Sequence, residues 1–484
     1  MRHRRGRPSL GPVTSVLWLR RDLRRRDLPA LGAATEATAD RTVLPLFVVD
    51  PALVGGAGRA RLDALREALT AAQESFDGAL VARVGRPEDV VPRVVREAGA
   101  GSVHVSGETT PYGRRRDERV AAALRDQDVP LVATGSPYAV TPGRIRTSAG
   151  DPYRVFTPFS RAWREHGWRG PAADPPGVRW VRRVESEALD DALGTDPGAG
   201  APAEAASAGA AHEPATPAGE ATALEAWAEF LDEGLAGYAD HRDRPDLEGT
   251  SRLSTALKLG TVHPRTLLAD IAAHPAAGTE SARTFVTELC WREFYADVLW
   301  HTPGSAWDDW RDLGLRYDDP AADPDAAAAL DAWRAGRTGY PFVDAGMRQL
   351  LATGWMHNRV RMVTASFLVK DLHLWWVHGA RHFMTHLRDG DLASNSHGWQ
   401  WVAGTGTDAA PYFRVFNPVT QGRRFDPDGV YVRRWVPELR HLPGAAAHEP
   451  WTARDGYVDG YPAQLVDHGE ARREALARYQ QAKG

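Results

Sequence analysis

Two patterns of hydrophobic positions divide this chain into an amino-terminal and a carboxy-terminal part. From about residue 16 to residue 135, short apolar runs rich in β-branched residues alternate with amphipathic stretches of helical period. The runs that read as strands lie at residues 16–19, 43–49, 79–84, 102–106 and 129–134. Strands that alternate with helices predict an α/β domain with a doubly wound, mostly parallel sheet, and we assign it to residues 14–140.

Beyond residue 218 the hydrophobic period is helical almost to the end of the chain, and 12 of the 17 tryptophans follow residue 285. An all-α domain over residues 219–484 is the simplest interpretation of this pattern. Residues 141–218 connect the two domains. Their last part, residues 190–218, is rich in Ala, Gly and Pro, which is typical of a linker.

Composition indicates a soluble globular protein with room for two or more cores, because the chain has 484 residues, 43% of them hydrophobic and 25% charged. No apolar run approaches the roughly 20 residues of a membrane span, and no apolar signal segment follows the basic amino terminus. We therefore expect a cytoplasmic location. The single cysteine, Cys290, excludes an internal disulfide and a cysteine-based zinc cluster, so we expect it to be a small buried residue and expect no metal site.

A polar and aromatic segment near residue 390 is the most informative part of the chain. Asp389, Asp391, Asn395, Trp399 and Trp401 fall within 13 positions. Burying so much polarity costs several kcal/mol unless a ligand or partner satisfies it. Asp391, Asn395 and Trp399 are spaced i, i+4 and i+8, which puts them on one face of a helix. The segment predicts the floor of a buried cofactor and nucleobase site; the alternative is a solvated polar stretch with structural tryptophans.

Four segments together resemble the photolyase and cryptochrome family of flavoproteins over nearly the whole chain. They are GTSRLS at 249–254, ELCWREFY at 288–295, residues 338–372 and residues 389–425. The resemblance implies an α/β antenna domain followed by an all-α FAD-binding domain. Within the family the chain is most similar to class I enzymes, monomers that repair cyclobutane pyrimidine dimers in DNA with light and reduced FAD.

The resemblance also assigns cofactor-binding positions. Asn395 matches the residue that faces flavin N5, and asparagine there is typical of photolyases. Hydroxyls and amides of GTSRLS suit a pyrophosphate, although a plain helix N-cap at Thr250 or Ser251 would explain the string equally well. The matching positions are Tyr238, Thr250, Ser251, Leu253, Ser254, Arg361, Asp389, Asp391 and Asn395, with Arg361 pairing with Asp389.

Two predicted helix faces mix aromatic and polar groups, which is what a flipped-out dimer requires for stacking and for hydrogen bonds to its base edges. The alternative is that they hold core tryptophans with incidental polar neighbours. By spacing, the faces are Glu288, Trp291 and Tyr295, and Trp355, Asn358 and Met362. By resemblance, the residues that act in repair are Trp291 and Trp401 as walls, Glu288 and Asn358 as base-edge contacts, Met362 as a packing contact, and Asn395.

One string separates the subgroups of the family. Enzymes for the (6-4) photoproduct typically place two histidines near residues 355–362, one of them a proton donor. Here Asn358 and Met362 stand in this region, and only His357 remains. Cyclobutane dimers need an electron rather than a general acid, so the sequence favours their repair.

Electrons for flavin photoreduction usually pass along three tryptophans in this family. Trp399 and Trp376 match the first two. Asp323 stands where the third is expected, about ten residues before Trp333, so Tyr317 is predicted to take that place. Trp375 is an alternative relay.

The antenna chromophore is expected in the α/β domain. Residues 107–117, GETTPYGRRRD, resemble members that bind 8-hydroxy-5-deazaflavin more than members that bind methenyltetrahydrofolate. Residues 150–163 are expected to add aromatic side chains to that site.

Net charge is −4, which argues against a surface coated with positive charge but not against a local patch. We expect Arg359, Arg414, Arg423 and Arg424 to bind DNA phosphates. Two other classes stay open: a cryptochrome-type blue-light photoreceptor, and a flavin oxidoreductase. The second lacks a visible nicotinamide site, because no G-x-G-x-x-G string follows the first strand.

Overall fold

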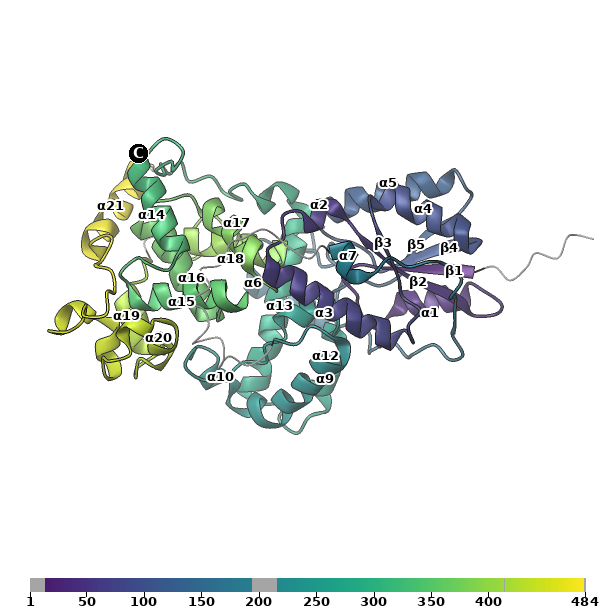
Figure 1. Cartoon of the computed structure of the whole chain (residues 1–484), viewed down its shortest axis with the longest axis horizontal. Coiled ribbons are helices and arrows are strands. Elements are labelled where there is room, and N and C mark those ends of the chain that lie inside the picture. The colour runs from purple at the N-terminus through teal and green to yellow at the C-terminus, as the bar shows by residue number, and fades with distance from the viewer. Residues whose placement is uncertain (1–13, 194–215, 413, 483–484) are drawn as a thin grey trace, which may run out of the picture.

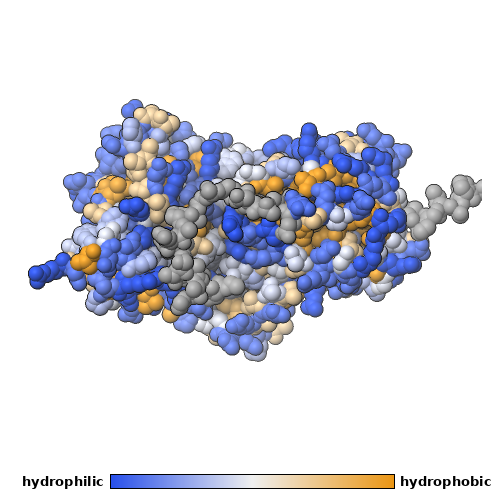
Figure 2. Space-filling model, in the orientation of Figure 1, coloured by the Kyte–Doolittle hydropathy of each residue, from blue (hydrophilic) through white to orange (hydrophobic). Residues whose placement is uncertain are grey.

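The computed structural model describes residues 14–193, 216–412 and 414–482. Figure 1 shows a sheet-containing domain at one end of the molecule and a helical domain at the other. Most of the predicted linker at 190–218 lies outside the described residues. The face in Figure 2 is largely hydrophilic, with its larger hydrophobic patches over the sheet-containing half.

The amino-terminal domain is built on one parallel sheet in the order β3-β2-β1-β4-β5. All five predicted strands are present, so the predicted fold class of this domain is confirmed. A sixth strand, β6, pairs with β2 and was not predicted, because two residues carry no alternation that a sequence can show. The strands are β1 Thr14–Leu19, β2 Thr42–Val49, β3 Val81–Val84, β4 Ala100–Val105, β5 Leu131–Ala133 and β6 Arg179–Trp180.

Helices cover both faces of this sheet. Successive side chains of a strand point to opposite faces, so Leu17 and Leu19 of β1 pack on one side and Val16 and Trp18 on the other. Helices α1 and α3 cover the first side, and α4 and α5 cover the second. The helices of this part are α1 Pro29–Glu36, α2 Pro51–Val54, α3 Arg59–Ser75, α4 Pro87–Ala98 and α5 Pro111–Arg125; α6 Phe156–His166 and α7 Leu189–Leu193 follow.

The carboxy-terminal domain is helical, as predicted, and Cys290 is buried in it. Its longest helix, α13, packs against α18, and α18 also packs against α16 and α17. The elements are α9 Glu220–Glu229, η1 Phe230–Gly234, η2 Leu235–Gly237, α10 Tyr238–His241, α11 Ser254–Leu259, α12 Pro264–Ala273, α13 Glu280–His301, η3 Pro303–Ala306, α14 Pro324–Arg334, α15 Pro341–Thr353, α16 Asn358–Ser366, η4 Phe367–Asp371, α17 Trp376–His386, α18 Leu392–Ala403, α19 Pro418–Phe425, α20 Val430–Trp435, η5 Pro437–Leu439, η6 Gly444–His448, η7 Pro450–Thr452 and α21 His468–Gln481.

Helix α18 lies between two apolar cores of the helical domain. One core is formed by α14 to α20 and the other by α6 and α9 to α13. Trp399 and Val402 of α18 belong to the first, while α13 carries side chains of the second. None of the helices described above combines the length and the apolarity that crossing a bilayer requires.

The two domains meet through close backbone contacts. The N–H of Leu23, just after β1, donates to the carbonyl of Leu259 at the end of α11 (3.3 Å). Gly260 ends α11 with a left-handed φ of +72°, and a Cβ at this position would lie 1.9 Å from the carbonyl oxygen of Arg21. In a second backbone contact, the N–H of Gly58 donates to the carbonyl of Thr385 in α17 (3.0 Å). The interface therefore requires a residue without a side chain at position 260.

We expect Gly260→Ala to lower the free energy of unfolding by about 2–4 kcal/mol, because it adds a backbone clash to a left-handed conformation. Gly99 is a matched control: it also ends a helix with a positive φ, +61°, but has no atom within 4 Å of a Cβ. Gly99→Ala should cost only about 1 kcal/mol. Chemical denaturation measures both changes, and equal losses would contradict the role of the contact with Arg21.

Candidate active site

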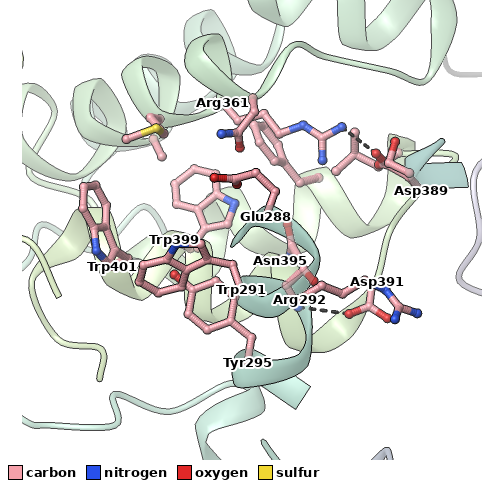
Figure 3. Close-up of a pocket in the computed structure, with 18 of the residues that line it drawn as sticks. Glu288, Trp291, Arg292, Tyr295, Arg361, Asp389, Asp391, Asn395, Trp399 and Trp401 are labelled. Carbon is pink, nitrogen blue, oxygen red and sulfur yellow. Dashed lines mark hydrogen bonds and ion pairs between the residues drawn. The ribbon is translucent and has the colours of Figure 1, made fainter. Parts of the chain in front are cut away.

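A pocket of about 510 Å³ opens beside α13, α16 and α18 of the helical domain. Figure 3 shows the indoles of Trp291 and Trp401 toward one end of it and Asp389 and Asp391 toward the other. Its volume is within the range of pockets for small molecules and cofactors. The predicted site residues that line it are Ser254, Glu288, Trp291, Asn358, Arg359, Arg361, Met362, Asp389, Asp391, Asn395, Trp399 and Trp401.

Helix α18 sets the floor of the pocket, as its sequence predicts. Asp391 is the N-cap of this helix, and its carboxylate accepts a hydrogen bond from the N–H of Ser394 (3.0 Å). Asn395 and Trp399 follow one and two turns later and line the same pocket. Trp399 is 3% exposed and Asp389 6% exposed. The alternative of a solvated polar stretch is therefore wrong.

Each aspartate of the floor is paired with an arginine. Asp389 accepts a hydrogen bond from Nη2 of Arg361 (2.7 Å), and Arg361 is held in turn by the carbonyl of Met356 (2.8 Å). This is the predicted pair. Asp391 accepts from Nη2 of Arg21 (2.5 Å), which comes from the α/β domain. Burial opposes ionisation of Asp391, but Arg21 and Arg292 outweigh it and hold the pKa of this carboxyl below its usual value.

The pocket carries an excess of basic side chains. Three carboxylates and five basic groups line it: Glu288, Asp389 and Asp391, and Arg242, Lys258, Arg292, Arg359 and Arg361. This excess suits an anionic ligand such as a pyrophosphate.

Buried polar atoms at the pocket lack partners within the protein. They include Oγ of Ser254 and Oδ1 of Asp389, and Nη2 of Arg61 beside Asp389. Buried polar groups without partners are costly, so these atoms indicate a hydrogen-bonding ligand. Together with the charge excess, they fit a dinucleotide cofactor such as FAD.

The apolar end of the pocket is rigid. The ring of Phe156 stacks on the indole of Trp291 with centroids 3.6 Å apart and planes 5° apart. Trp291 is thereby supported from behind while it still lines the pocket. This placement corrects one expectation: Phe156 and Phe159, from the segment expected at the antenna site, pack against Trp291 and Phe294 of α13. The sequence could not show which domain α6 would join.

Comparison with known proteins identifies the family. Residues 15–177 match the family profile described as "DNA photolyase", and residues 285–481 match "FAD binding domain of DNA photolyase". Proteins named deoxyribodipyrimidine photo-lyase are 40% identical in Streptomyces griseus and 37% in Escherichia coli, over 97% of this chain and 99% of each relative. The chain belongs to the DNA photolyase family. FAD is therefore the cofactor that its helical domain is built to bind.

Solved structures agree with this assignment. A bacterial class III photolyase from Agrobacterium tumefaciens superposes with a TM-score of 0.87 at 36% identity, covering 98% of both chains. An archaeal photolyase from Sulfolobus tokodaii, described with two FAD molecules, superposes with a TM-score of 0.80 at 27% identity, covering 97% of this chain and all of that one.

Two details of the photolyase motifs differ from the sequence prediction. Helix α16 begins at Asn358 with His357 as its N-cap, so Trp355 precedes the helix and does not share a face with Asn358 and Met362. Helix α11 begins at Ser254 with Leu253 at its N-cap position, so Thr250 and Ser251 are not the N-cap.

Four of the predicted cofactor residues lie near the pocket rather than in its lining. Tyr238 is buried among Phe230 and Phe285, with Arg242 over its ring at 5.6 Å. Thr250, Ser251 and Leu253 precede Ser254, which does line the pocket. Their contact with the cofactor stays a prediction.

Three basic residues that line the pocket were missed by sequence reasoning: Arg242, Lys258 and Arg292. Arg242 pairs with Glu288 (2.7 Å). Arg292 follows Trp291 directly, and its guanidinium donates to the carbonyls of Pro137 and Leu257. A basic residue on a helix normally indicates a solvated surface, so only its position next to the aromatic motif could have marked Arg292.

The tryptophans of the predicted electron relay, Trp399 and Trp376, are both buried in the helical domain. Trp399 packs against Phe383 and Trp333, with ring centroids 5.0 and 6.0 Å apart. Trp376 is buried outside the pocket, and its Nε1 donates to Asp309 (2.6 Å). Burial, followed by the charge of Asp309, raises the pKa of Tyr317.

Trp375 and Asp323, the two other positions considered for the electron relay, have different surroundings from Tyr317. Trp375 is half-buried, and its ring centroid lies 6.3 Å from that of Trp376. Asp323, at the place expected for a third tryptophan, is the N-cap of α14 and accepts from the N–H of Asp325. The requirement for a helix cap explains why aspartate occupies this position.

The predicted DNA-binding arginines differ in their surroundings. Arg359 lines the pocket, pairs with Asp243 (2.7 Å) and lies over the ring of Phe425 at 4.4 Å. Arg424 lies over the same ring at 5.0 Å. Arg423 is paired with Glu449, and Arg414 is exposed in the loop after α18.

Affinity for FAD should depend on pH through Lys258. Burial, assisted by Arg61 and Arg21, lowers the pKa of Lys258 to about 7. The negative pyrophosphate of FAD favours the charged amine and should raise this pKa. Binding should therefore be tightest below about pH 7 and weaken as the pH rises toward the pKa of the bound state.

This pH dependence is measured as the FAD dissociation constant of the apoprotein between about pH 6 and about pH 9. Lys258→Met is the matched variant, and it should flatten the profile. An unchanged slope in Lys258→Met would assign the titration to another group.

Proposed function

We propose that this chain is a deoxyribodipyrimidine photo-lyase, an enzyme that repairs cyclobutane pyrimidine dimers in DNA with light. The observation that carries the proposal is the combination in one pocket of a polar, charged end and an aromatic end. The first suits a flavin dinucleotide and the second a pair of fused bases. Relatives that bear this enzyme name align over almost their full length.

Ser254, Arg361, Asp389, Asp391 and Asn395 would hold FAD. Bound FAD in its fully reduced form supplies, on excitation by blue or near-ultraviolet light, the electron that opens the dimer. The protein orients the groups around it: the amide nitrogen of Asn395 donates to the carbonyl of Ala380 (3.1 Å), which fixes the side-chain amide. Tyr238, Thr250, Ser251 and Leu253 would complete the cofactor site from nearby.

The dimer would enter at the aromatic end. Trp291, backed by Phe156, and Trp401 offer flat apolar walls for its bases. Glu288 is oriented by Arg242 and can accept hydrogen bonds from base N–H groups, while the amide of Asn358 can both donate and accept. Met362 would pack against the bound bases.

Repair of the (6-4) photoproduct is not favoured. His357, the remaining histidine of that motif, is buried and caps α16 through its Nδ1, which accepts from the N–H of Arg359. Burial, with the nearby arginines, lowers the pKa of His357 to about 3, so it is neutral at pH 7 and cannot act as a cationic proton donor. The cryptochrome alternative is disfavoured because Glu288, Trp291 and Trp401, the side chains proposed to bind the dimer, line the pocket.

Phosphates flanking the lesion would bind Arg359 and Arg424, which both lie over the ring of Phe425, together with Arg414 and Arg423. Affinity for DNA should then weaken with salt. We also propose that the enzyme acts as a monomer in the cytoplasm.

The antenna would lie in the α/β domain. A second hollow of about 410 Å³ lies near the carboxyl ends of its strands, and Tyr112 of the predicted segment 107–117 lines it together with Asp50, Arg86, Glu88 and Arg119. We propose 8-hydroxy-5-deazaflavin as the antenna in preference to methenyltetrahydrofolate. The second FAD described for the Sulfolobus tokodaii photolyase is the third candidate, and the absorption spectrum of the purified protein distinguishes the three.

Purified protein with reduced flavin should restore dimer-containing oligonucleotides only under light. Trp291→Ala should weaken binding of that DNA at least about fivefold, because stacking contributes about 1–3 kcal/mol per base. Trp180→Ala, in the α/β domain, is the control and should leave binding unchanged. Repair in darkness, or equal effects of the two variants, would contradict the proposal.

Tyr317→Phe should slow photoreduction of the oxidised flavin at least several-fold, because phenylalanine cannot be oxidised in place of the tyrosine. Repair by chemically reduced protein should not change. Flash photolysis compares this variant with Trp375→Phe. A slow Trp375→Phe and a normal Tyr317→Phe would assign the relay to Trp375.

A further inference from the structure

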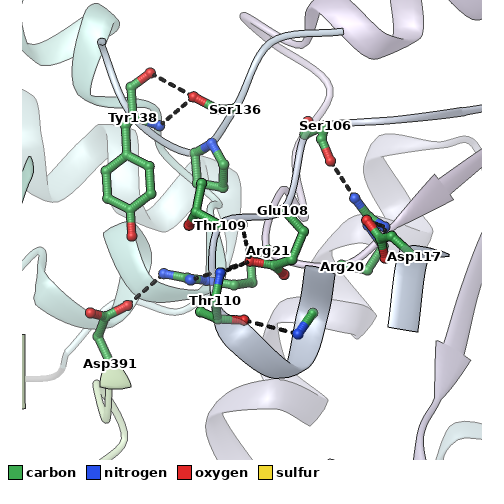
Figure 4. A network of polar contacts seen from close by, with 12 residues as sticks. Arg20, Arg21, Ser106, Glu108, Thr109, Thr110, Asp117, Ser136, Tyr138 and Asp391 are labelled. Carbon is green, nitrogen blue, oxygen red and sulfur yellow. Dashed lines mark hydrogen bonds and ion pairs between the residues drawn. The ribbon is translucent and has the colours of Figure 1, made fainter. Parts of the chain in front are cut away.

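A buried chain of alternating charges runs from the α/β domain to the pocket, and Figure 4 shows most of its members. Its ends belong to different domains: one end lies at β1 and α5, and the other at the start of α18. Successive pairs are 2.5, 3.9, 3.6, 2.9 and 3.0 Å apart, in the order Asp391, Arg21, Glu108, Arg116, Asp117 and Arg20.

Every member of this chain is largely shielded from water. Side-chain exposure ranges from 4% at Arg116 to 17% at Arg21. The chain holds three arginines and three carboxylates, so its charges balance. Removing one partner of such a pair leaves an uncompensated buried charge, which is strongly destabilising.

Arg21 is the member that crosses between the domains. It is the second residue after β1, and Figure 4 shows its guanidinium reaching Asp391 and Glu108 beside the ring of Tyr138. Arg292 of α13 lies over that same ring at 4.4 Å. The side of Asp391 that faces the α/β domain is therefore built from residues outside α18.

The carboxylate of Asp391 is fixed at both oxygens. Oδ1 accepts from the N–H of Ser394 (3.0 Å) and starts α18, while Oδ2 accepts from Arg21 (2.5 Å). Asp389 differs, because its ion-pair partner, Arg361, belongs to the helical domain itself. The ion-pair partner of Asp389 thus comes from its own domain, whereas that of Asp391 comes from the α/β domain.

We propose that Arg21 is a positioning residue of the flavin site. It fixes the Asp391 carboxylate and the start of α18, so that the helical domain binds FAD tightly only when Arg21 of the α/β domain is paired with Asp391. This inference rests on the proposed assignment of the pocket to FAD, and it adds the α/β domain to the groups that complete that site.

Without Arg21, Asp391 would have to stay charged beside fewer cations, take up a proton or turn away. Each of these changes alters a group that faces the cofactor. Loss of Arg20 is different, because Asp117 keeps Arg116 as a partner at 2.9 Å and Asp391 keeps Arg21. The two neighbouring arginines therefore make a matched pair.

The test measures the FAD dissociation constant of apoprotein variants, with thermal unfolding of each apoprotein as the control for folding. Arg21→Met should weaken FAD binding about tenfold or more. Arg21→Lys should weaken it by less, because the lysine ammonium keeps the positive charge but lacks the planar set of N–H donors of the guanidinium. Arg20→Met should change it less than about threefold. FAD binding by Arg21→Met within about twofold of the unaltered protein, or an equal loss in Arg20→Met, would overturn the proposal.

A double-mutant cycle separates positioning from a general loss of stability. If Arg21 acts through Asp391, Arg21→Met should add little to the effect of Asp391→Asn, whereas additive losses would overturn the proposal. Should Arg21→Met not fold, Arg21→Lys in both backgrounds gives the same comparison. The readout is flavin binding, so a protein that binds FAD but repairs no DNA would refute the proposed function and leave this inference standing.

Discussion

Burial of opposite charges around one pocket is the constraint on which the rest of this structure depends. Arg361 and Arg21 reach the buried carboxylates of Asp389 and Asp391 at hydrogen-bonding distance, and a buried carboxylate without such a partner is strongly destabilising. Arg21 belongs to the other domain, so the two domains must dock closely. The backbone contact at Gly260 is where that closeness excludes a side chain.

The same pocket has two kinds of surface, one charged and one aromatic. Its charged end offers unpaired hydrogen-bonding atoms at Ser254 and Asp389, which a cofactor can satisfy. Its aromatic end offers Trp291 on a rigid support. Near this end, Glu288 and Arg359 are paired with the adjacent residues Arg242 and Asp243. Side chains that would contact the substrate are thus held in place before it arrives.

Much of this arrangement could be predicted from the sequence, because it follows from local periodicity. The five longer strands and the face of α18 were found in this way. Other features depend on contacts distant in sequence. Phe156 joins the helical domain, Arg21 crosses the interface and Trp355 precedes its expected helix, and none of these leaves a periodic signal. Arginine is also so common in this chain that Arg242 and Arg292 do not stand out.

A crystal structure of the purified flavin-bound protein tests the central claim most directly. The account predicts one FAD in the pocket beside α18, with Arg361, Asp389, Asp391 and Ser254 around it and an open space between the flavin ring and Trp291. A flavin bound elsewhere, or a pocket in which side chains close the space over the ring, would contradict it.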